Sequence, residues 1–171
     1  PPDSALVIYL TLLATRGRPL LAALGALVLL TTAAPAVAQT ADDEARQHEH
    51  CTQVFAWLTL EQVRFGQSAS WIRRSSYPFL QRLAEMAQMC PSFAISITGH
   101  TDSVGAPAFN QQLSLERAEA VAKFLAELGV AQDRLIIAGK GDAEPVENND
   151  TAFGRQRNRR IELRLVPVDE S

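Results

Sequence analysis

A carboxylate and a guanidinium lie close enough in the sequence to share one site. Asp102 belongs to the stretch G-H-T-D-S-V-G (99–105), and Arg117 lies on the helix predicted to follow it. Asn110, Leu113 and Arg117 are spaced by three and four residues, which places them on one side of that helix. Such a pair suits a zwitterion, because Asp binds an ammonium and Arg binds a carboxylate through two parallel hydrogen bonds. The alternative is that Asp102 and Arg117 pair with each other, or that Arg117 is a solvated helix residue.

His100 lies in the same stretch and is the residue that a catalytic interpretation would use as a base. No second histidine or nucleophile accompanies it at a supporting spacing, and Ser68, Ser103 and Ser114 have no base at such a spacing either. We therefore expect a loop histidine held by structural hydrogen bonds. No catalytic residue and no enzymatic activity are predicted.

The N-terminal segment has the layout of a secretory signal peptide. R-G-R (16–18) precedes a short apolar run (20–30), and an A-V-A sequence ends at Ala38. The run is shorter than the about 20 apolar residues that a transmembrane helix needs. We expect residues 1–38 to be a signal peptide, with residues 1–15 of doubtful origin, and cleavage after Ala38. The alternative is an uncleaved membrane anchor, the one case in which membrane association is expected.

The two cysteines, Cys51 and Cys90, are expected to form a disulfide, because export leads to an oxidising compartment. The alternative is a metal site, since His48 and His50 precede the Cys51 thiol. Residues 39–50 are polar and lack an apolar period, so they are predicted to be a linker.

Apolar periodicity predicts alternating strands and helices after residue 60. Alternation marks the strands, and a spacing of i, i+3, i+4, i+7 from Leu80 to Ala87 marks the buried face of a helix. The expected fold class is α/β (α+β): a two-layer sandwich of order βαβαβ(α)β, with a four-stranded mixed sheet and helices on one face. The predicted elements are strands over 62–65, 93–98, 135–137 and 161–166, and helices from a cap at Ser75 or Ser76 to a stop at Pro91, over 107–128 and over 152–156.

A run of arginines near the C-terminus makes nucleic-acid binding a possible interpretation. The formal net charge of the chain is -3, and no aromatic residue interleaves the run, so we expect no nucleic-acid partner. The run is predicted instead to frame a pocket for an anionic polymer, or to pair with Glu144, Glu147 and Glu162. The arginines are Arg155, Arg157, Arg159, Arg160 and Arg164.

Several separated motifs occur in order between Phe65 and Leu165. They are G-H-T-D-S-V-G (99–105), Asn110, L-S (113–114), R-A (117–118), G-K-G-D-A-E-P (139–145), Asn148 and N-R-R-I-E (158–162). In sequence and spacing they resemble the OmpA-like C-terminal domain family, found in outer membrane protein A, peptidoglycan-associated lipoprotein and flagellar motor stator proteins. The resemblance predicts a domain over residues 51–168.

The resemblance implies a site for peptidoglycan, centred on the diaminopimelate of the stem peptide. Asp102 is similar to the family carboxylate that meets the ligand's ammonium, and Arg117 to the guanidinium that takes its carboxylate. Asn110 resembles a polar contact of that site, and Leu113 resembles part of its wall.

The same resemblance implies that Thr101 and Gly105 shape the loop. Arg159 is similar to residues near the pocket rim, and Arg160 is the other candidate for that position.

The function implied is non-covalent binding of peptidoglycan, which would anchor or stabilise the cell envelope from the periplasm or the outer membrane. No cofactor is expected, and an envelope protein partner is possible. One alternative is a membrane-anchored structural coupler of the motor-stator or secretion type. Another is an enzyme acting on cell-wall peptide, with His100 as base or with a His–Cys metal site.

Overall fold

The computed structural model describes residues 36–66 and 68–168, with side chains from residue 42 onward. Residues 1–35 lie outside this range, so nearly all of the predicted signal peptide (1–38), and with it the doubtful segment 1–15, falls outside the described residues. Among the described helices, none combines the length and the apolar character needed to cross a membrane.

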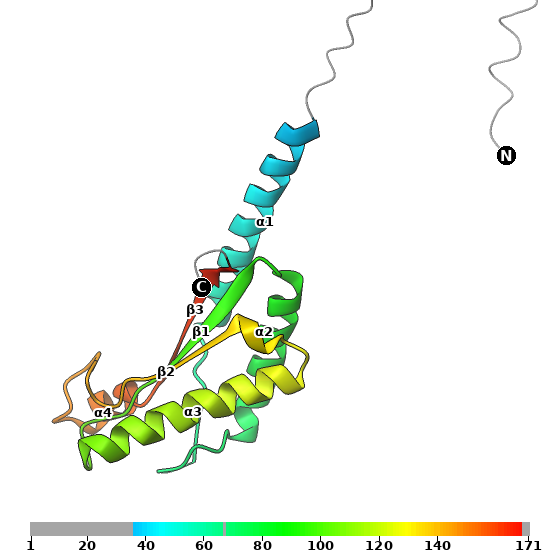
Figure 1. Ribbon diagram of the computed structural model, residues 1–171. Coiled ribbons are helices and arrows are strands. Elements are labelled where there is room, and N and C mark those ends of the chain that lie inside the picture. The colour runs from blue at the N-terminus through cyan, green and yellow to red at the C-terminus, as the bar shows by residue number, and fades with distance from the viewer. Residues whose placement is uncertain (1–35, 67, 169–171) are drawn as a thin grey trace, which may run out of the picture. The chain divides into compact units, whose positions relative to one another are not determined.

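A three-stranded mixed sheet forms the centre of the fold (Figure 1). Strand β1 (Phe93–Gly99) pairs in parallel with β2 (Leu135–Gly139) and antiparallel with β3 (Ile161–Pro167). The parallel pair is connected through helix α3 (Pro107–Glu127). The strands alternate as predicted, because Ile95 and Ile97 of β1 are fully buried while Ser96 and Thr98 are only half-buried.

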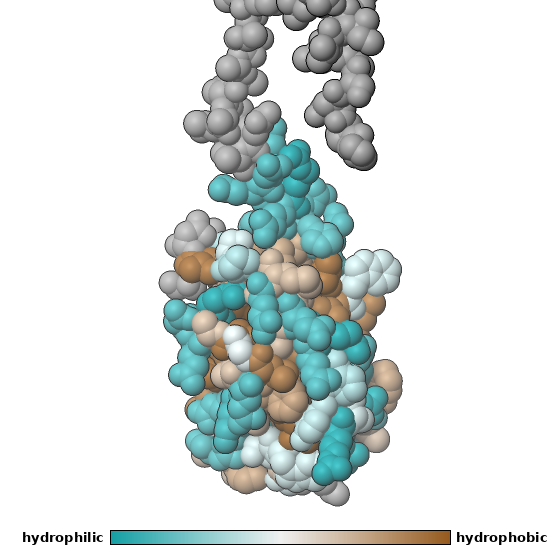
Figure 2. All heavy atoms as spheres, turned by 90° about the vertical axis from the view of Figure 1, so that its right-hand side faces the viewer, coloured by the Kyte–Doolittle hydropathy of each residue, from teal (hydrophilic) through white to brown (hydrophobic). Residues whose placement is uncertain are grey.

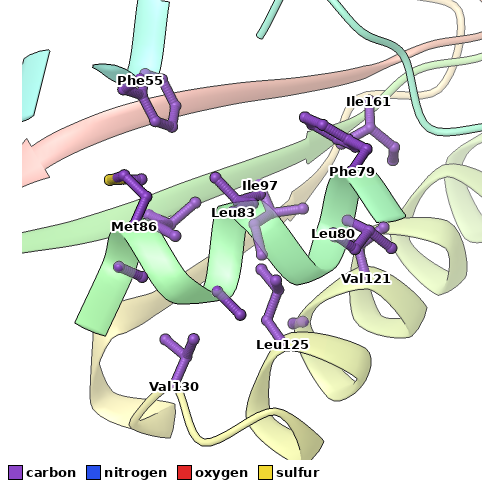
Figure 3. Packing of buried hydrophobic residues seen from close by; sticks show 14 of the residues in the cluster. Phe55, Phe79, Leu80, Leu83, Met86, Ile97, Val121, Leu125, Val130 and Ile161 are labelled. Atoms are coloured by element: carbon purple, nitrogen blue, oxygen red, sulfur yellow. The ribbon is translucent and has the colours of Figure 1, made fainter. Parts of the chain in front are cut away.

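Helices α2 (Tyr77–Met89) and α3 pack on the face of the sheet that carries Ile95 and Ile97. Their apolar stripes meet each other and the sheet, as Figure 3 shows for residues of both helices and for Ile97. The predicted stripe of α2 is confirmed, and its buried members are Phe79, Leu80, Leu83, Ala84, Met86 and Ala87. A short helix, α4 (Ala152–Asn158), precedes β3, and two 3₁₀ turns lie at Arg74–Ser76 and Gln132–Arg134.

The strand predicted over 62–65, the first in chain order, is not part of this sheet. Phe65 instead makes an isolated antiparallel bridge with Ile72, and the amide of Arg73 donates to the carbonyl of Arg64 at 2.8 Å. The segment therefore folds back on itself as a hairpin. A short apolar alternation is shared by a hairpin arm and a sheet strand, so the sequence pattern did not separate the two.

Residues 39–50, predicted to be a linker, form most of the first half of helix α1 (Ala36–Leu58). Its side chains from Asp42 to His50 are exposed, and Figure 2 shows hydrophilic residues over this part of the helix. The absence of an apolar period reflects this exposure and does not mean that the helix is absent. Beyond Cys51 the helix joins the domain, where Phe55 is buried in the common core.

The disulfide between Cys51 and Cys90 is present and ties α1 to the end of α2. The ring of His48 lies against that of Phe93, with centroids 4.4 Å apart. Because Cys51 is disulfide-bonded, it is not available as the thiolate of the alternative metal site. No group of three potential metal-ligating side chains occurs among the residues from 36 onward that the structure describes.

Two glycines allow α3 to lie directly on the ends of β1 and β2. A Cβ at Gly99 would lie 1.9 Å from the carbonyl oxygen of Ser114, and one at Gly139 would lie 2.6 Å from the amide nitrogen of Leu115. Ser114 fixes the same contact, because its Oγ donates to Gln111 O at 2.8 Å and accepts from the Gly141 amide at 2.9 Å. This close approach positions the β1–α3 loop and the side chains of α3.

The disulfide closes a loop with a sequence separation of 39 residues. Replacing Cys51 and Cys90 together by serine should therefore lower the free energy of unfolding by about 3 to 4 kcal/mol, since the cross-link restricts the unfolded chain. Urea denaturation of the oxidised protein and of the double variant measures the difference. Wild-type protein treated with a reductant should match the double variant, and equal stability of its oxidised and reduced forms would contradict the prediction.

Candidate functional site

A pocket of about 610 Å³ opens at the end of the sheet where β1 and β2 finish. Four parts of the chain line it: the hairpin residues 62–66 and 68–73, the loop after β1, helix α3, and α4 with the residue after it. Figure 1 shows the start of α3 and α4 at this same end of the sheet. The lining includes five arginines and a single carboxylate, that of Asp102.

Asp102 is nearly buried, and both oxygens of its carboxylate are engaged. Oδ1 accepts from the amide of Val104 at 3.1 Å, which closes a local turn, and Oδ2 accepts from a guanidinium nitrogen of Arg159. The carbonyl of Asp102 also accepts from Nδ2 of Asn110 at 3.2 Å. The carboxylate is therefore held in one position at the rim of the pocket.

Arg117 is 5% exposed and reaches the pocket from α3. Its Nε donates to the carbonyl of Ala69 at 2.9 Å, and its guanidinium carbon lies 5.2 Å from the centre of the Phe65 ring. Burial lowers the pKa of Arg117, Arg159 lowers it further, and Asp102 opposes both effects. None of the ion pairs among the described residues includes Arg117, so it does not pair with Asp102 as the alternative interpretation required.

Three further residues implied by the resemblance line the pocket, and a fourth, Gly105, is next to a lining residue in the chain. Leu113 is buried and lines it, and Asn110 holds the loop from the first turn of α3. Thr101 is buried, and its amide donates to Gly141 O at 2.8 Å. Gly105 is not among the lining residues, but its φ of +104° provides the left-handed turn into α3.

The two adjacent arginines 159 and 160 point to different places. Arg159 lines the pocket and pairs with Asp102. Arg160 turns away, where its guanidinium donates to the carbonyl of Glu144 at 3.3 Å and lies 3.5 Å from the Glu162 carboxylate. The arginine run therefore divides: Arg155 and Arg159 line the pocket, whereas Arg160 and Arg164 lie against the Glu162 carboxylate.

Sequence reasoning missed two arginines of the pocket, Arg64 and Arg73, because it placed 62–65 in the sheet. The available signal was that Arg64 stands between the apolar Val63 and Phe65, so it must face away from the core. Arg155 belonged to the predicted basic run, and it also lines the pocket.

His100 is fully buried, and neither ring nitrogen has a hydrogen-bond partner among the described residues. The expected structural hydrogen bonds of this side chain are therefore absent, and only its backbone amide is bonded, to Arg160 O at 2.9 Å. Nε2 lies 3.5 Å from Oε2 of Glu162. Since His100 does not line the pocket, it is not placed to act as a base on a ligand there.

The fold and the pocket together define a small mixed α/β domain with one arginine-rich site at the end of its sheet. The profile of the OmpA family matches residues 64–159, which is more than half of the chain. The chain belongs to the OmpA family.

Relatives with established names match the same region. Outer membrane porin F of Pseudomonas fluorescens is 39% identical over 100 residues, which are 58% of this chain and 31% of that protein. The peptidoglycan-binding protein ArfA of Mycobacterium bovis is 36% identical over 101 residues, 59% of this chain and 31% of that protein. The chain thus spans about a third of the length of these relatives.

Among solved structures, the peptidoglycan-associated lipoprotein from Burkholderia pseudomallei has a similar fold. The TM-score is 0.60 at 27% sequence identity, and the match covers 64% of this chain and 93% of that one.

Burial and the positive charge of Arg160 lower the pKa of His100, and Glu162 and Glu144 only partly offset them. The His100 ring therefore binds a proton less readily in the native state than in the unfolded chain, where a histidine titrates at about pH 6.5. The free energy of unfolding should fall as the pH drops from 7.5 to 5.5, and the decrease should be smaller in His100→Phe. Urea denaturation at several pH values measures both slopes.

The matched control is His50→Phe, because this histidine is exposed on α1. It should keep the wild-type pH dependence. A wild-type slope in His100→Phe would show that another group is responsible.

Proposed function

We propose that this chain binds peptidoglycan non-covalently and that the pocket takes the charged part of a stem peptide. The observation that carries the proposal is the buried guanidinium of Arg117, which lines a pocket and has no ion-pair partner among the described residues. Burying a cation is costly unless it is compensated, so an anionic ligand group would stabilise the site. Membership of the OmpA family and the names of two relatives, ArfA and the peptidoglycan-associated lipoprotein, support the choice of polymer.

Arg117 would bind the anionic group of the ligand. Only its Nε has an acceptor among the described residues, the carbonyl of Ala69. Its two terminal nitrogens are therefore available to hold a carboxylate in a two-point contact. The stacking on Phe65 and the bond to Ala69 fix the plane of the guanidinium, so little side-chain entropy is lost on binding.

Asp102 would bind the cationic group of the ligand. A ligand ammonium would approach Oδ2, where Arg159 now donates, while Oδ1 stays bound to the Val104 amide. Arg159 is half-exposed on its side-chain surface and has space to move aside. Two poles of opposite sign in one pocket suit a zwitterionic amino-acid centre, and in peptidoglycan the diaminopimelate residue has this chemistry. Thr101, Asn110, Leu113 and Gly105 would shape the space between the poles.

We further propose that the chain is exported through residues 1–38 and acts in the periplasm, on the outer-membrane side of the cell wall. The Cys51–Cys90 disulfide supports this location, because such bridges persist in oxidising compartments.

A second candidate is a membrane-anchored coupler, and helix α1 favours it. The helix runs from Ala36 into the domain core, and its described residues before Cys51 are exposed and polar. A helix of this kind would serve as a spacer between an uncleaved N-terminal segment and a wall-bound domain. Fractionation of cells followed by N-terminal sequencing separates the candidates, since a coupler stays with the membrane and keeps residues before 38.

Asp102→Asn and Arg117→Lys should each weaken binding to purified sacculi by about thirtyfold or more, corresponding to about 2 kcal/mol. Asp102→Asn keeps an oxygen for the Val104 amide and removes only the charge, and Arg117→Lys keeps the charge and removes the two-point fork. Co-sedimentation with sacculi, with free diaminopimelate as competitor, measures the effect.

Lys123→Gln is the matched control, because Lys123 is exposed on α3 and does not line the pocket. It should bind like the wild type. If both site variants bind like the wild type while circular dichroism shows intact folds, the site assignment is wrong. Sacculi that sediment without the wild-type protein would refute the function itself.

A further inference from the structure

We propose that Arg64, Arg73 and Arg155 form a second anion subsite in the pocket, so that the chain selects stem peptides with a further free carboxylate over their amidated forms. The inference rests on the proposed peptidoglycan function and names the chemical form of the ligand that this chain prefers. It starts from the hairpin that replaces the predicted first strand.

Arg64 and Arg73 stand directly opposite each other in that hairpin. The bridge between Phe65 and Ile72 sets the register, and the Arg73 amide donates to the Arg64 carbonyl at 2.8 Å. Opposed residues of an antiparallel pair project to the same face, and like charges in such a pair are destabilising. Both residues line the pocket, so the hairpin brings two positive charges to one wall of it.

Hydrogen bonds and a contact with Arg117 hold the hairpin in this position. The Arg64 amide donates to Oγ of Ser76 at 2.8 Å, and Nε of Arg73 donates to Phe65 O at 2.8 Å. Arg117 adds its bond to Ala69 and its contact with Phe65. These bonds hold the backbone that carries the two arginines, so like-charge repulsion does not separate the two arms of the hairpin.

Arg155 lines the same pocket from α4. One of its terminal nitrogens donates to the carbonyls of Asn149 and Asp150, at 2.7 and 3.1 Å, which positions the side chain without neutralising it. None of the ion pairs among the described residues includes Arg64, Arg73 or Arg155. The single carboxylate of the lining, Asp102, already pairs with Arg159.

One ligand carboxylate at Arg117 leaves most of this positive charge uncompensated. A ligand with a second carboxylate removes more of it, whereas an amide at that position offers a neutral acceptor and weaker hydrogen bonds. Stem peptides contain more than one carboxyl group, and each can be free or amidated. The charge balance of the pocket therefore favours the peptide with the larger number of free carboxylates.

The test uses two soluble muropeptides that differ only in amidation of a carboxyl group outside the diaminopimelate centre, titrated against the full chain by isothermal calorimetry. Wild type should bind the free acid about three- to tenfold more tightly, a modest ratio because Arg64 and Arg73 are exposed to solvent. The Arg64→Gln variant and the Arg64→Gln/Arg73→Gln double variant should lower the ratio towards one and should leave binding of the amidated peptide nearly unchanged.

Arg157→Gln is the charge-matched control, because Arg157 is exposed on α4 and does not line the pocket. It should keep the wild-type ratio. Equal affinity of wild type for the two peptides overturns the second subsite and leaves the proposed function intact. A ratio that falls as much in Arg157→Gln as in Arg64→Gln also overturns it, since the preference would then be a long-range charge effect. Binding of neither peptide overturns the subsite together with the proposed function.

Discussion

The position of one buried guanidinium, that of Arg117, determines how the site is built. It connects α3 to the hairpin through Ala69 and Phe65, and it reaches the pocket with no carboxylate partner among the described residues. Glycine at 99 and at 139 lets α3 approach the strands closely enough for this reach. The close packing of α3 on the strands therefore sets the position of Arg117, and with it the chemistry of the pocket.

Charges around the pocket are divided in a way that leaves it positive. Asp102 is engaged by Arg159, while Arg160 and Arg164 share the Glu162 carboxylate outside the pocket. The one carboxylate of the lining is thus already paired, and Arg64, Arg73, Arg117 and Arg155 line the cavity without an ion-pair partner among the described residues. This excess of positive charge is the physical basis of the proposed preference for a ligand with several carboxylates.

Much of the fold could be predicted from the sequence, because apolar period is a local property. The stripe of α2 and the alternation of β1 both follow from neighbouring residues. The hairpin and the first half of α1 could not be predicted in this way. A short alternating run has the same pattern in a hairpin arm and in a sheet strand, and an exposed polar helix has no apolar stripe to detect.

For the site, the sequence alone determined the residue types and one shared helix face, and by resemblance it indicated Asp102, Asn110, Leu113 and Arg117. Only the tertiary structure decided that Asp102 pairs with Arg159 and not with Arg117, that Arg160 turns away, and that Arg64 and Arg73 enter the pocket. The reason is physical: ion pairing depends on distances between side chains that lie far apart in the sequence, and those distances exist only once the hairpin, α3 and α4 meet at the end of the sheet.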